Sequence, residues 1–391
     1  MEEFFKAFDR GIDRRGTYCE KWDFNERTFG RADVLPMWVA DMDFASPDCV
    51  RDALIGRASH GAYGYTDMQQ PMMEAVAGWM KNRHGVTVLP EECMYSSGVV
   101  DSILFALKTV TSPGDGVIIQ PPVYGPFRRM TLRAGCECRE NPLAETEGGW
   151  RMDLDGLESL LKEGAKALIM SNPHNPVGRV WSAEELQSVI SLVNRYGATL
   201  ISDEIHADFA LPGHRHTSVL SFEGAERAVC LVSATKTFNL AGLRTSTIIV
   251  RDDELRRKVK KKMEEMGADT PNIFGSVAQT AAYTLGAPWL DALVMYLDEN
   301  RKLAEAFFSK NAPAIVPARM EGTYLMWLDC RALGMDQPEM DRFFVEKAGV
   351  GLSSGTHFGE AGAGFMRINL AAPKTRVEEG LRRIAEAVNA L

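Results

Sequence analysis

The chain has 391 residues, of which 45% are hydrophobic and 25% are charged, and its formal net charge at pH 7 is −9. This length predicts one large domain together with a smaller one. An acidic protein repels phosphate backbones and anionic lipid, which excludes nucleic acid and membrane surfaces as expected partners.

The compartment is predicted from the cysteines and from the apolar runs. The seven cysteines are odd in number and scattered, which is typical of a reducing cytosol rather than of a disulfide framework. The first fifteen residues are rich in charge and lack the apolar stretch of a secretory signal. No run approaches the ~20 apolar residues of a membrane span. We therefore expect a cytoplasmic protein.

The first segment with the composition of a ligand site is Ser96-Ser97-Gly98-Val99-Val100. It follows a short predicted strand and precedes a predicted helix over residues 101–109. Backbone amides at a helix N-terminus bind phosphate well, and a glycine there lets the backbone approach a ligand closely. This segment therefore predicts one side of an anion site.

The middle of the chain alternates short apolar runs with amphipathic stretches. Ser182, followed three residues later by Glu185, forms a capping-box pattern that predicts a helix over 182–196. Alternation of this kind predicts an α/β fold, with a mainly parallel sheet covered by helices on both faces. The predicted strands are short, apolar or β-branched, and bounded by turn residues; they are 116–120, 167–170, 199–202, 228–233 and 247–250.

Polar residues follow three of these strands directly. Asn175 lies in the turn Asn-Pro-His-Asn-Pro-Val-Gly, whose prolines and glycine fix the backbone. Asp203 ends the next strand, where its carboxylate needs a cationic partner such as a ring nitrogen, unless it caps the following turn. Lys236 follows the third strand. Ligands bind outside the carboxyl ends of strands in open α/β sheets, so these residues are expected to converge.

The surroundings of Lys236 indicate an amine next to a phosphate. Hydroxyl groups of Ser233 and Thr235 precede it, and Arg244 follows eight residues later. An exposed surface lysine is the alternative interpretation of the same position. The group of four fits a phosphorylated ligand better, since hydroxyls and a guanidinium both bind phosphate oxygens.

The last hundred residues have a different pattern. They contain a predicted long helix around 292–309, then strand-like pieces at 324–328 and 365–370. We expect a large domain over 46–289 and a small one that combines 1–45 with 290–391. Arg367 lies within the last strand-like piece, where an exposed arginine would be the ordinary interpretation.

In combination, these motifs resemble one family. Asn-Pro-x-Asn-Pro-x-Gly, Asp-Glu, Ser-x-x-Lys and a trailing arginine occur in the order found in fold-type-I pyridoxal-phosphate enzymes of the aspartate aminotransferase superfamily. The resemblance covers about residues 22–391. It implies a large domain with a mainly parallel sheet covered by helices and a smaller α+β domain built from both chain ends.

Within that superfamily the chain most resembles the cystathionine β-lyase (C–S lyase) group of MalY/PatB type. His206 stands where many aminotransferases have a tyrosine, and this difference favours the lyase group. The segments that carry the resemblance are 21–23, 36–44, 64–66, 172–181, 203–209 and 234–246.

The resemblance implies pyridoxal 5′-phosphate as cofactor and a role for each motif. Lys236 would hold the cofactor covalently and then act as general base. Asp203 would keep the ring nitrogen protonated. Asn175 would bind the phenolic oxygen beside His206, and Tyr124 would stack on the ring. The other implied cofactor-binding residues are Gly98, Val99, Val100, Ser233, Thr235, Arg244 and Tyr65.

The substrate implied by the resemblance is a small amino acid. Arg367 would grip its α-carboxylate, and Ala40, Asp41 and Asn175 would line the same pocket. Tyr65 would act in the site of the neighbouring subunit, as phosphate ligand and proton donor, so a homodimer with shared sites is expected. No metal ion is expected.

The implied reaction is α,β-elimination of cystathionine or a related S-substituted cysteine to pyruvate, ammonia and a thiol. A plain aminotransferase stays open as the alternative, because both reactions begin with loss of the same α-proton. A metal-dependent hydrolase is a distant alternative and leaves Lys236 and Arg244 unexplained. The hydrolase would take its ligands from Asp203, Glu204, His206, Asp208, His214 and His216.

A third alternative is a non-catalytic relative of the enzyme, but such a protein would not need to retain Lys236, Asp203 and Arg244.

Overall fold

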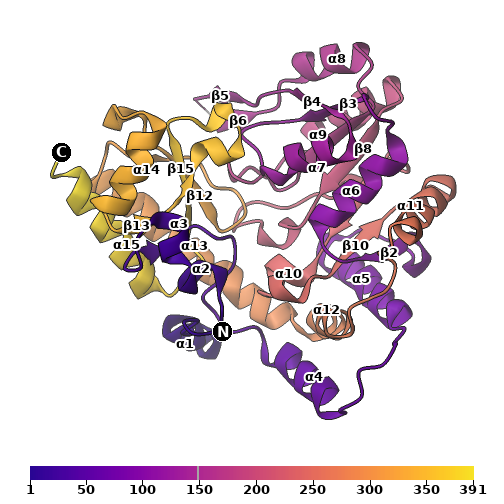
Figure 1. Ribbon diagram of the computed structural model, residues 1–391, viewed down its shortest axis with the longest axis horizontal. Helices are drawn as coiled ribbons and strands as arrows, with labels where there is room; N and C mark the ends of the chain where they lie inside the picture. Colours follow the sequence, from indigo (N-terminus) through magenta and orange to yellow (C-terminus); the bar gives the residue numbers. More distant parts are fainter. Residues whose placement is uncertain (148) are drawn as a thin grey trace.

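The computed structural model describes residues 1–147 and 149–391, and a seven-stranded sheet lies at its centre (Figure 1). β10 runs antiparallel to both of its neighbours, and the other neighbouring pairs are parallel. In spatial order the strands are β2 (Cys93–Ser96), β10 (Ser246–Ile249), β9 (Val229–Val232), β8 (Thr199–Asp203), β7 (Ala167–Ser171), β3 (Gly116–Ile119) and β4 (Glu137–Glu140). The predicted α/β fold and its five strands are confirmed.

Successive residues of a strand point to opposite faces of the sheet, and here the residues on both faces are apolar. Helices therefore cover both faces. Ile169 and Leu231 pack in one buried cluster, while Met170 and Val232 pack in another. The first cluster contains α6 (Val99–Val110), α7 (Pro126–Ala134) and α11 (Asp253–Glu265). The second contains α5 (Gln69–His84), α8 (Leu154–Lys162), α9 (Ala183–Arg195), α12 (Ile273–Leu285) and α13 (Ala287–Asn311).

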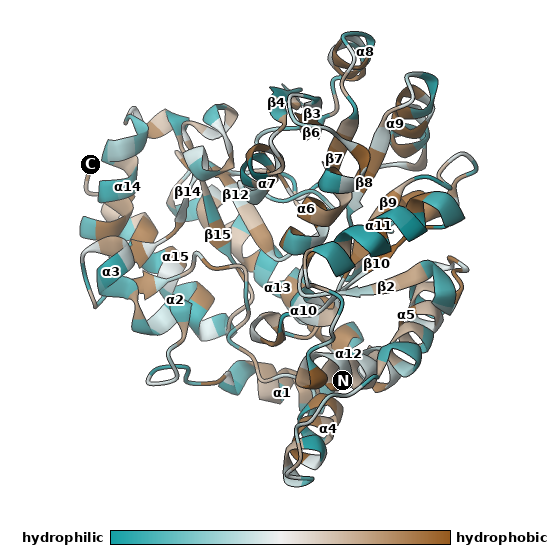
Figure 2. Ribbon diagram, turned by 45° about the vertical axis from the view of Figure 1, so that its right-hand side comes forward, coloured by the Kyte–Doolittle hydropathy of each residue, from teal (hydrophilic) through white to brown (hydrophobic). Residues whose placement is uncertain are grey.

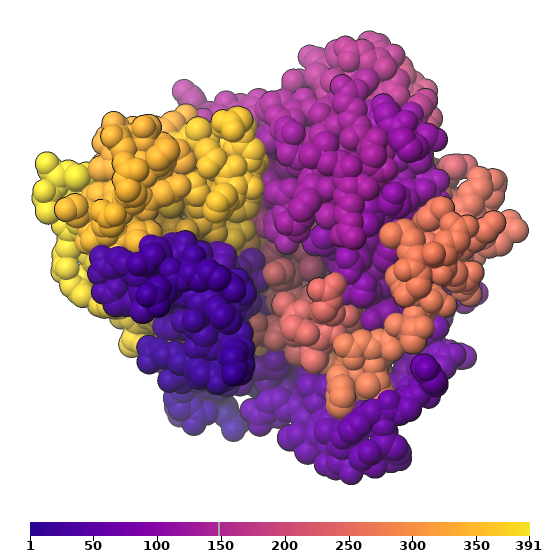
Figure 3. Space-filling view, viewed as in Figure 1, coloured from indigo at the N-terminus to yellow at the C-terminus, as the bar shows by residue number. Residues whose placement is uncertain are grey.

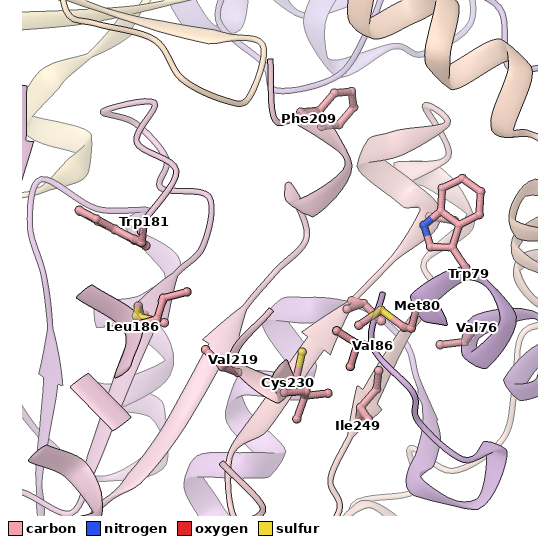
Figure 4. Close-up of a cluster of buried hydrophobic side chains, with 14 of the residues drawn as sticks. Val76, Trp79, Met80, Val86, Trp181, Leu186, Phe209, Val219, Cys230 and Ile249 are labelled. Atoms are coloured by element: carbon pink, nitrogen blue, oxygen red, sulfur yellow. The ribbon is translucent and has the colours of Figure 1, made fainter. Parts of the chain in front are cut away.

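The figures show how these layers are packed. Hydrophobic colour is concentrated on the strands and on the sheet-facing sides of the helices, while α11 turns a hydrophilic side outward (Figure 2). In the second cluster, Val76 and Met80 of α5 lie toward Val86 and Ile249 (Figure 4). Trp79 of the same helix packs against Phe238 and Tyr283. The central sheet is therefore shielded from water on both faces, and only its edges remain open to a ligand.

The α9 helix forms as its sequence predicts. The Ser182 hydroxyl accepts a hydrogen bond from the Glu185 backbone N–H at 3.2 Å, and the Glu185 carboxylate accepts one from the Ser182 backbone N–H at 2.9 Å. The helix buries Leu186, Val189 and Val193 on one face. The capping box is confirmed, and α13 likewise contains the predicted helix over 292–309.

A second, antiparallel sheet is built from the C-terminal part of the chain. Its order is β11 (Val316–Pro317), β12 (Leu325–Asp329), β15 (Phe365–Asn369) and β14 (Ser353–Ser354). The N-terminal β1 (Leu35–Pro36) pairs with β13 (Val350–Gly351), so the indigo and yellow ends of the chain lie side by side (Figure 1). This arrangement supports our proposed division into 46–289 and 1–45 with 290–391. Helices of this part are α1 (Glu2–Arg10), α2 (Glu20–Asp23), α3 (Asn25–Phe29), α14 (Gln337–Glu346) and α15 (Lys374–Val388).

A buried charge cluster fixes the segment that leads from the N-terminus into the site. Asp43 is fully buried and binds Lys21 Nζ at 3.0 Å and Trp22 Nε1 at 2.9 Å. Arg376 of α15 lies 2.9 Å from the same carboxylate. Burial would raise the pKa of Asp43, but these donors lower it below its ordinary value. The predicted lyase-like segments 21–23 and 36–44 therefore form one packed unit.

None of the described helices combines the length and the apolar character needed to cross a membrane. The remaining helices and strands of the fold are α4 (Asp48–Ser59), α10 (Ala234–Thr237), β5 (Ala144–Thr146) and β6 (Gly149–Arg151).

Candidate active site

A cavity of about 980 Å³ lies at the carboxyl edge of the large sheet. β2, β3, β7, β8 and β9 all end at this edge, and the residues that follow them line the cavity. The face drawn in Figure 3 is hollowed between the indigo N-terminal segment and the purple and magenta part of the chain. The expected convergence of polar residues at one edge is confirmed in position.

The amine of Lys236 lies in the cavity among charged and polar groups. Its Nζ donates a hydrogen bond to the Ala40 carbonyl at 2.6 Å, and the same carbonyl accepts one from the Tyr324 hydroxyl at 3.0 Å. Burial lowers the pKa of Lys236 to about 8; Asp41 and Asp203 oppose this shift, whereas Arg367 adds to it. An amine with this pKa is partly deprotonated near neutral pH, as a general base requires.

Asp203 ends β8, where the sheet holds its carboxylate in a dry environment. The side chain is 5% exposed and accepts one hydrogen bond, from the Ile205 N–H at 3.1 Å. Burial raises the pKa of Asp203 to about 7, against the lowering effects of that bond and of Lys236. A buried carboxyl group is stabilised in its charged form by a cationic partner, which would lower its pKa toward the ordinary value.

His206 follows three residues later in the turn before Ala207–Phe209. It is buried, and its Nδ1 has no hydrogen-bond partner among the described residues. Burial, together with Lys236 and Arg367, lowers the pKa of His206 to about 3, so its imidazole is neutral at physiological pH. Its ring packs edge-on against Tyr324 at 5.9 Å. A neutral imidazole can accept or donate one hydrogen bond to a ligand without adding charge.

Arg367 lies in the middle of β15 and reaches the same cavity. Its Nη1 donates to Asn175 Oδ1 at 3.0 Å, and its Nη2 donates to the Trp38 carbonyl at 2.8 Å and to Ser353 Oγ at 3.1 Å. Its guanidinium lies 4.8 Å from the ring centre of Phe358. Nε is buried without a partner among the described residues.

Burial lowers the pKa of Arg367 to about 10, while Tyr124 and Tyr324 raise it, so the group stays cationic at neutral pH. A buried cation with an unused donor is suited to a carboxylate.

Three predicted phosphate-binding residues, Gly98, Thr235 and Arg244, line the cavity, and Ser233 lies behind them. Gly98 precedes α6 with φ of 148°, and a methyl group added to it would meet no atom within 4 Å. Ser233 Oγ and Thr235 Oγ1 lie 2.7 Å apart. Arg244 Nη2 binds Asp101 at 3.0 Å and its side chain is 68% exposed. Hydroxyls, helix amides and a guanidinium are groups that bind anions in proteins.

Most of the predicted site residues line the cavity, and three do not. Ser233 is buried behind the lining, where its hydroxyl binds the Thr245 carbonyl at 2.7 Å. The Asp41 carboxylate binds Arg14 at 2.6 Å, so it faces the N-terminal charge cluster. Tyr65 is fully exposed in the loop between α4 and α5. The predicted residues that do line the cavity are Ala40, Gly98, Val99, Val100, Tyr124, Asn175, Asp203, His206, Thr235, Lys236, Arg244 and Arg367.

Four residues that the sequence did not indicate complete the site. Trp38 and Ser353 bind Arg367, and Tyr324 shares the Ala40 carbonyl with Lys236. Asn369 donates to the carbonyl of Asp41 at 2.6 Å. Asn369 follows Arg367 by two residues on β15, so its side chain lies on the same face of the strand. That spacing is the one signal in the sequence that could have identified it.

The carboxylates and histidines of the hydrolase alternative are not grouped as metal ligands. Glu204 binds His216 at 3.1 Å, and Asp208 binds His84 at 3.0 Å, each as a buried pair. Within residues 1–147 and 149–391, no three histidine, cysteine, aspartate or glutamate side chains are arranged to hold a metal ion. The geometry of the described residues therefore gives the hydrolase alternative no support.

Asp203→Asn is expected to stabilise the cofactor-free chain at pH 8. In the folded chain the pKa of Asp203 is about 7, against 3.8 as the ordinary value. Between these two values the folded state binds more protons than the unfolded state, so the free energy of unfolding falls as the pH rises and stays lowered above the folded pKa. Asparagine carries no charge and removes this loss.

Urea unfolding of both cofactor-free proteins at pH 5.5 and pH 8 measures the effect. We expect the variant's advantage to grow by about 2 kcal/mol between the two pH values, because the interval from pH 5.5 to the folded pKa of about 7 is worth about 1.4 kcal/mol per pH unit. Asp48→Asn, which removes an exposed carboxylate, is the matched control. A constant difference between wild type and Asp203→Asn across the two pH values would contradict the assignment.

Comparison with known proteins agrees with this geometry. Residues 32–384 match the family model described as aminotransferase class I and II. Cystathionine β-lyase PatB of Bacillus subtilis (strain 168) is 42% identical over 385 residues, which cover 98% of this chain and 100% of that protein.

Two solved structures are similar over nearly the whole chain. Cystalysin from Treponema denticola, which contains a pyridoxal 5′-phosphate cofactor, is 35% identical with a TM-score of 0.94, and the match covers 98% of each chain. The PLP-bound C–S lyase from Staphylococcus hominis is 32% identical with a TM-score of 0.91, and the match covers 97% of each chain.

Proposed function

Because this chain belongs to the aminotransferase class I and II family of fold-type-I enzymes, we propose that it is a pyridoxal-phosphate-dependent carbon–sulfur lyase. Its proposed substrates are cystathionine and related S-substituted cysteines. The observation that carries the proposal is a single cavity that brings together a buried amine, a buried carboxyl and a buried arginine, from Lys236, Asp203 and Arg367. Full-length similarity to a cystathionine β-lyase supports elimination as the reaction.

The residues of the cavity fit pyridoxal phosphate. Open space beside Gly98 at the start of α6 leaves room for the phosphate, and Arg244 lines the same part of the cavity. Thr245 Oγ1 and His206 Nδ1 are buried without partners among the described residues, and a polar ligand would supply them. Asp203 would face the ring nitrogen, whose positive charge would lower the raised pKa of this carboxyl.

When bound, the cofactor makes the α-proton of an attached amino acid acidic by drawing electrons from Cα. Arg367 binds the α-carboxylate and so fixes the orientation of Cα. Lys236 Nζ, with its lowered pKa, takes the α-proton. The electron pair left on Cα forms a bond to Cβ while the Cβ–S bond breaks, and its electrons leave with sulfur. The proton held on Lys236 would then neutralise the thiolate. The three-carbon fragment that remains would be released as 2-aminoacrylate, and one water would convert it to pyruvate and ammonia.

Asn175 joins the two halves of the site. Its Oδ1 accepts from Arg367, and its backbone N–H donates to Ser171 Oγ at 3.2 Å. The amide nitrogen of the side chain remains available for the phenolic oxygen of the cofactor, next to His206. We propose that Tyr124 packs against the cofactor ring, because it lines the cavity beside these residues.

We propose a homodimer in which Tyr65 serves the site of the partner. Tyr65 is fully exposed and lines no part of the cavity of its own chain, so contact with a second chain is the route by which it would reach a site. All seven cysteines are free thiols, which supports our proposal that the enzyme works in the cytoplasm.

Incubation of the holoenzyme with cystathionine, without any added keto acid, tests the function. We expect many equivalents of pyruvate and of thiol per active site, in equal amounts. The alternative, a plain aminotransferase, would stop after one equivalent, since the cofactor would be left in its amine form without an acceptor. The geometry of Lys236 and Arg367 serves both reactions, so only this product balance separates them.

A further inference from the structure

Five exposed or half-exposed charged side chains line the cavity, and three of them, Glu20, Asp101 and Arg244, are already in ion pairs. Glu20 binds Arg27 at 2.8 Å, and Asp101 binds Arg244 at 3.0 Å. Arg129 and Arg133 line the same cavity and are both exposed. Neither has a carboxylate partner among the described residues. The exposed part of the lining, here called the rim, therefore has two uncompensated positive charges on a protein whose formal net charge is −9.

The two arginines are placed together by the helix that carries them. Arg129 and Arg133 are four residues apart on α7, so their side chains lie on the same face. Arg128, beside them in sequence, turns away from the cavity and binds Glu140 at 2.6 Å. The helix begins two residues after Tyr124, which lines the inner part of the cavity. One face of α7 thus leads from the inner site to the opening.

The direction of a bound substrate follows from the proposed function. Arg367 is 6% exposed and would hold the α-carboxylate at the inner end of the cavity. Lys236 would act at Cα beside it. The substituent on sulfur must then extend outward, past Tyr124 and toward α7, because the inner space is taken by the cofactor and the carboxylate.

We propose that Arg129 and Arg133 bind an anionic group at the far end of the sulfur substituent. This inference rests on the proposed lyase function and specifies its substrate class: S-substituted cysteines whose thiol part ends in a carboxylate. Guanidinium groups match the geometry of a carboxylate and stay charged at all physiological pH values. A positive rim also concentrates anionic substrates at the opening. The far carboxylate of cystathionine is one such group.

Three substrates of similar length separate charge from size: S-(2-carboxyethyl)-L-cysteine, S-propyl-L-cysteine and S-(2-aminoethyl)-L-cysteine. The measured quantity is the ratio of kcat/KM for the anionic substrate to that for the neutral one, compared between holoenzymes. Differences in leaving-group chemistry cancel in this comparison. For Arg129→Ala/Arg133→Ala we expect the ratio to fall about tenfold, as expected for loss of two partly exposed charge contacts. Arg128→Ala, on the same helix, is the matched control and should leave the ratio unchanged.

Two further measurements sharpen the test. Arg129→Glu/Arg133→Glu should shift the preference toward the aminoethyl substrate, because two positive charges at the cavity opening are replaced by two negative ones. The wild-type preference for the anionic substrate should weaken as salt is added, since exposed charges are screened. Visible absorbance of the bound cofactor should be the same in all variants.

The outcomes distinguish this inference from the function on which it rests. If the neutral substrate yields pyruvate and thiol in every variant but the ratio does not change, the subsite is wrong and the lyase stands. If the double variant loses cofactor and both substrates fall equally, the two arginines serve the phosphate instead, and the subsite is likewise wrong. If wild type releases no pyruvate from either substrate, the lyase function fails, and this inference fails with it.

Discussion

Replacing Lys236 with alanine is expected to lower kcat by more than about 10⁴-fold, because one general acid–base group supplies about 10²–10⁴ and the covalent attachment of the cofactor is lost as well. Among the described residues that line the cavity, Lys236 is the one lysine. Its lowered pKa and its place beside Ala40 suit a group that gives up and regains a proton. No other described side chain that lines the cavity combines a lowered pKa with a hydrogen bond to the Ala40 carbonyl.

Lys236→Arg is the informative control for this prediction. Arginine keeps the positive charge near Asp203 but does not lose its proton in a protein, so it cannot serve as base. Both variants are therefore expected to be inactive, whereas a small primary amine added to Lys236→Ala should restore part of the turnover. Steady-state pyruvate release measures activity, and mass spectrometry after borohydride reduction locates the cofactor. Near-normal activity of Lys236→Ala would remove the central residue of the proposed mechanism.

The same variant tests the shared site. Mixing Lys236→Ala with an inactive Tyr65 variant should restore activity if subunits exchange, because a hybrid dimer contains one site with both native residues. Subunit exchange is followed independently by labelling one variant. No recovery after complete exchange would show that Tyr65 acts within its own chain or outside the site.

Arg367→Ala is expected to raise KM strongly while the cofactor stays bound. Truncation of one partner of a buried charge pair costs about 2–5 kcal/mol, which corresponds to roughly 30- to 4,000-fold in kcat/KM. The structure supports this expectation because Arg367 is buried, keeps an unpaired Nε and is held in place by Asn175, Trp38 and Ser353. Arg367→Lys keeps a charge but loses the planar fork, so we expect it to recover only part of the affinity.

Steady-state kinetics and cofactor absorbance, measured on the same samples, separate the two roles of the site. A large loss of cofactor with unchanged KM would place Arg367 at the cofactor rather than at the substrate. Ser353→Ala removes one of the contacts that hold Arg367, and a smaller change in KM in the same direction is expected from it.

Local signals in the sequence predicted the parts of the fold that local physics determines. The five central strands were predicted from short apolar runs, and α9 from the Ser182–Glu185 capping box. The site residues were found where they follow strands, since parallel strands end at one edge. Resemblance to a known family, rather than spacing, indicated the roles of Lys236 and Arg367.

Local sequence patterns do not predict contacts between segments that are distant in the sequence. Ala40 and Lys236 are far apart in sequence, and no pattern predicts that the carbonyl of one accepts from the amine of the other. Asp41 is predicted to line the substrate pocket, but its carboxylate binds Arg14 instead. Ser353 lies in the small sheet and Tyr324 directly precedes its strand β12, and the position of this sheet against the large one depends on packing of the whole chain.

Products released from cystathionine by the holoenzyme, without an added keto acid, test the central claim most directly. Pyruvate, free thiol and the amine form of the cofactor are followed in one sample over many multiples of the enzyme concentration. The proposed lyase predicts continuous release of pyruvate and thiol in equal amounts, with little amine form, and no release from Lys236→Ala. A single equivalent of keto acid, no thiol and full conversion of the cofactor to its amine form would contradict it.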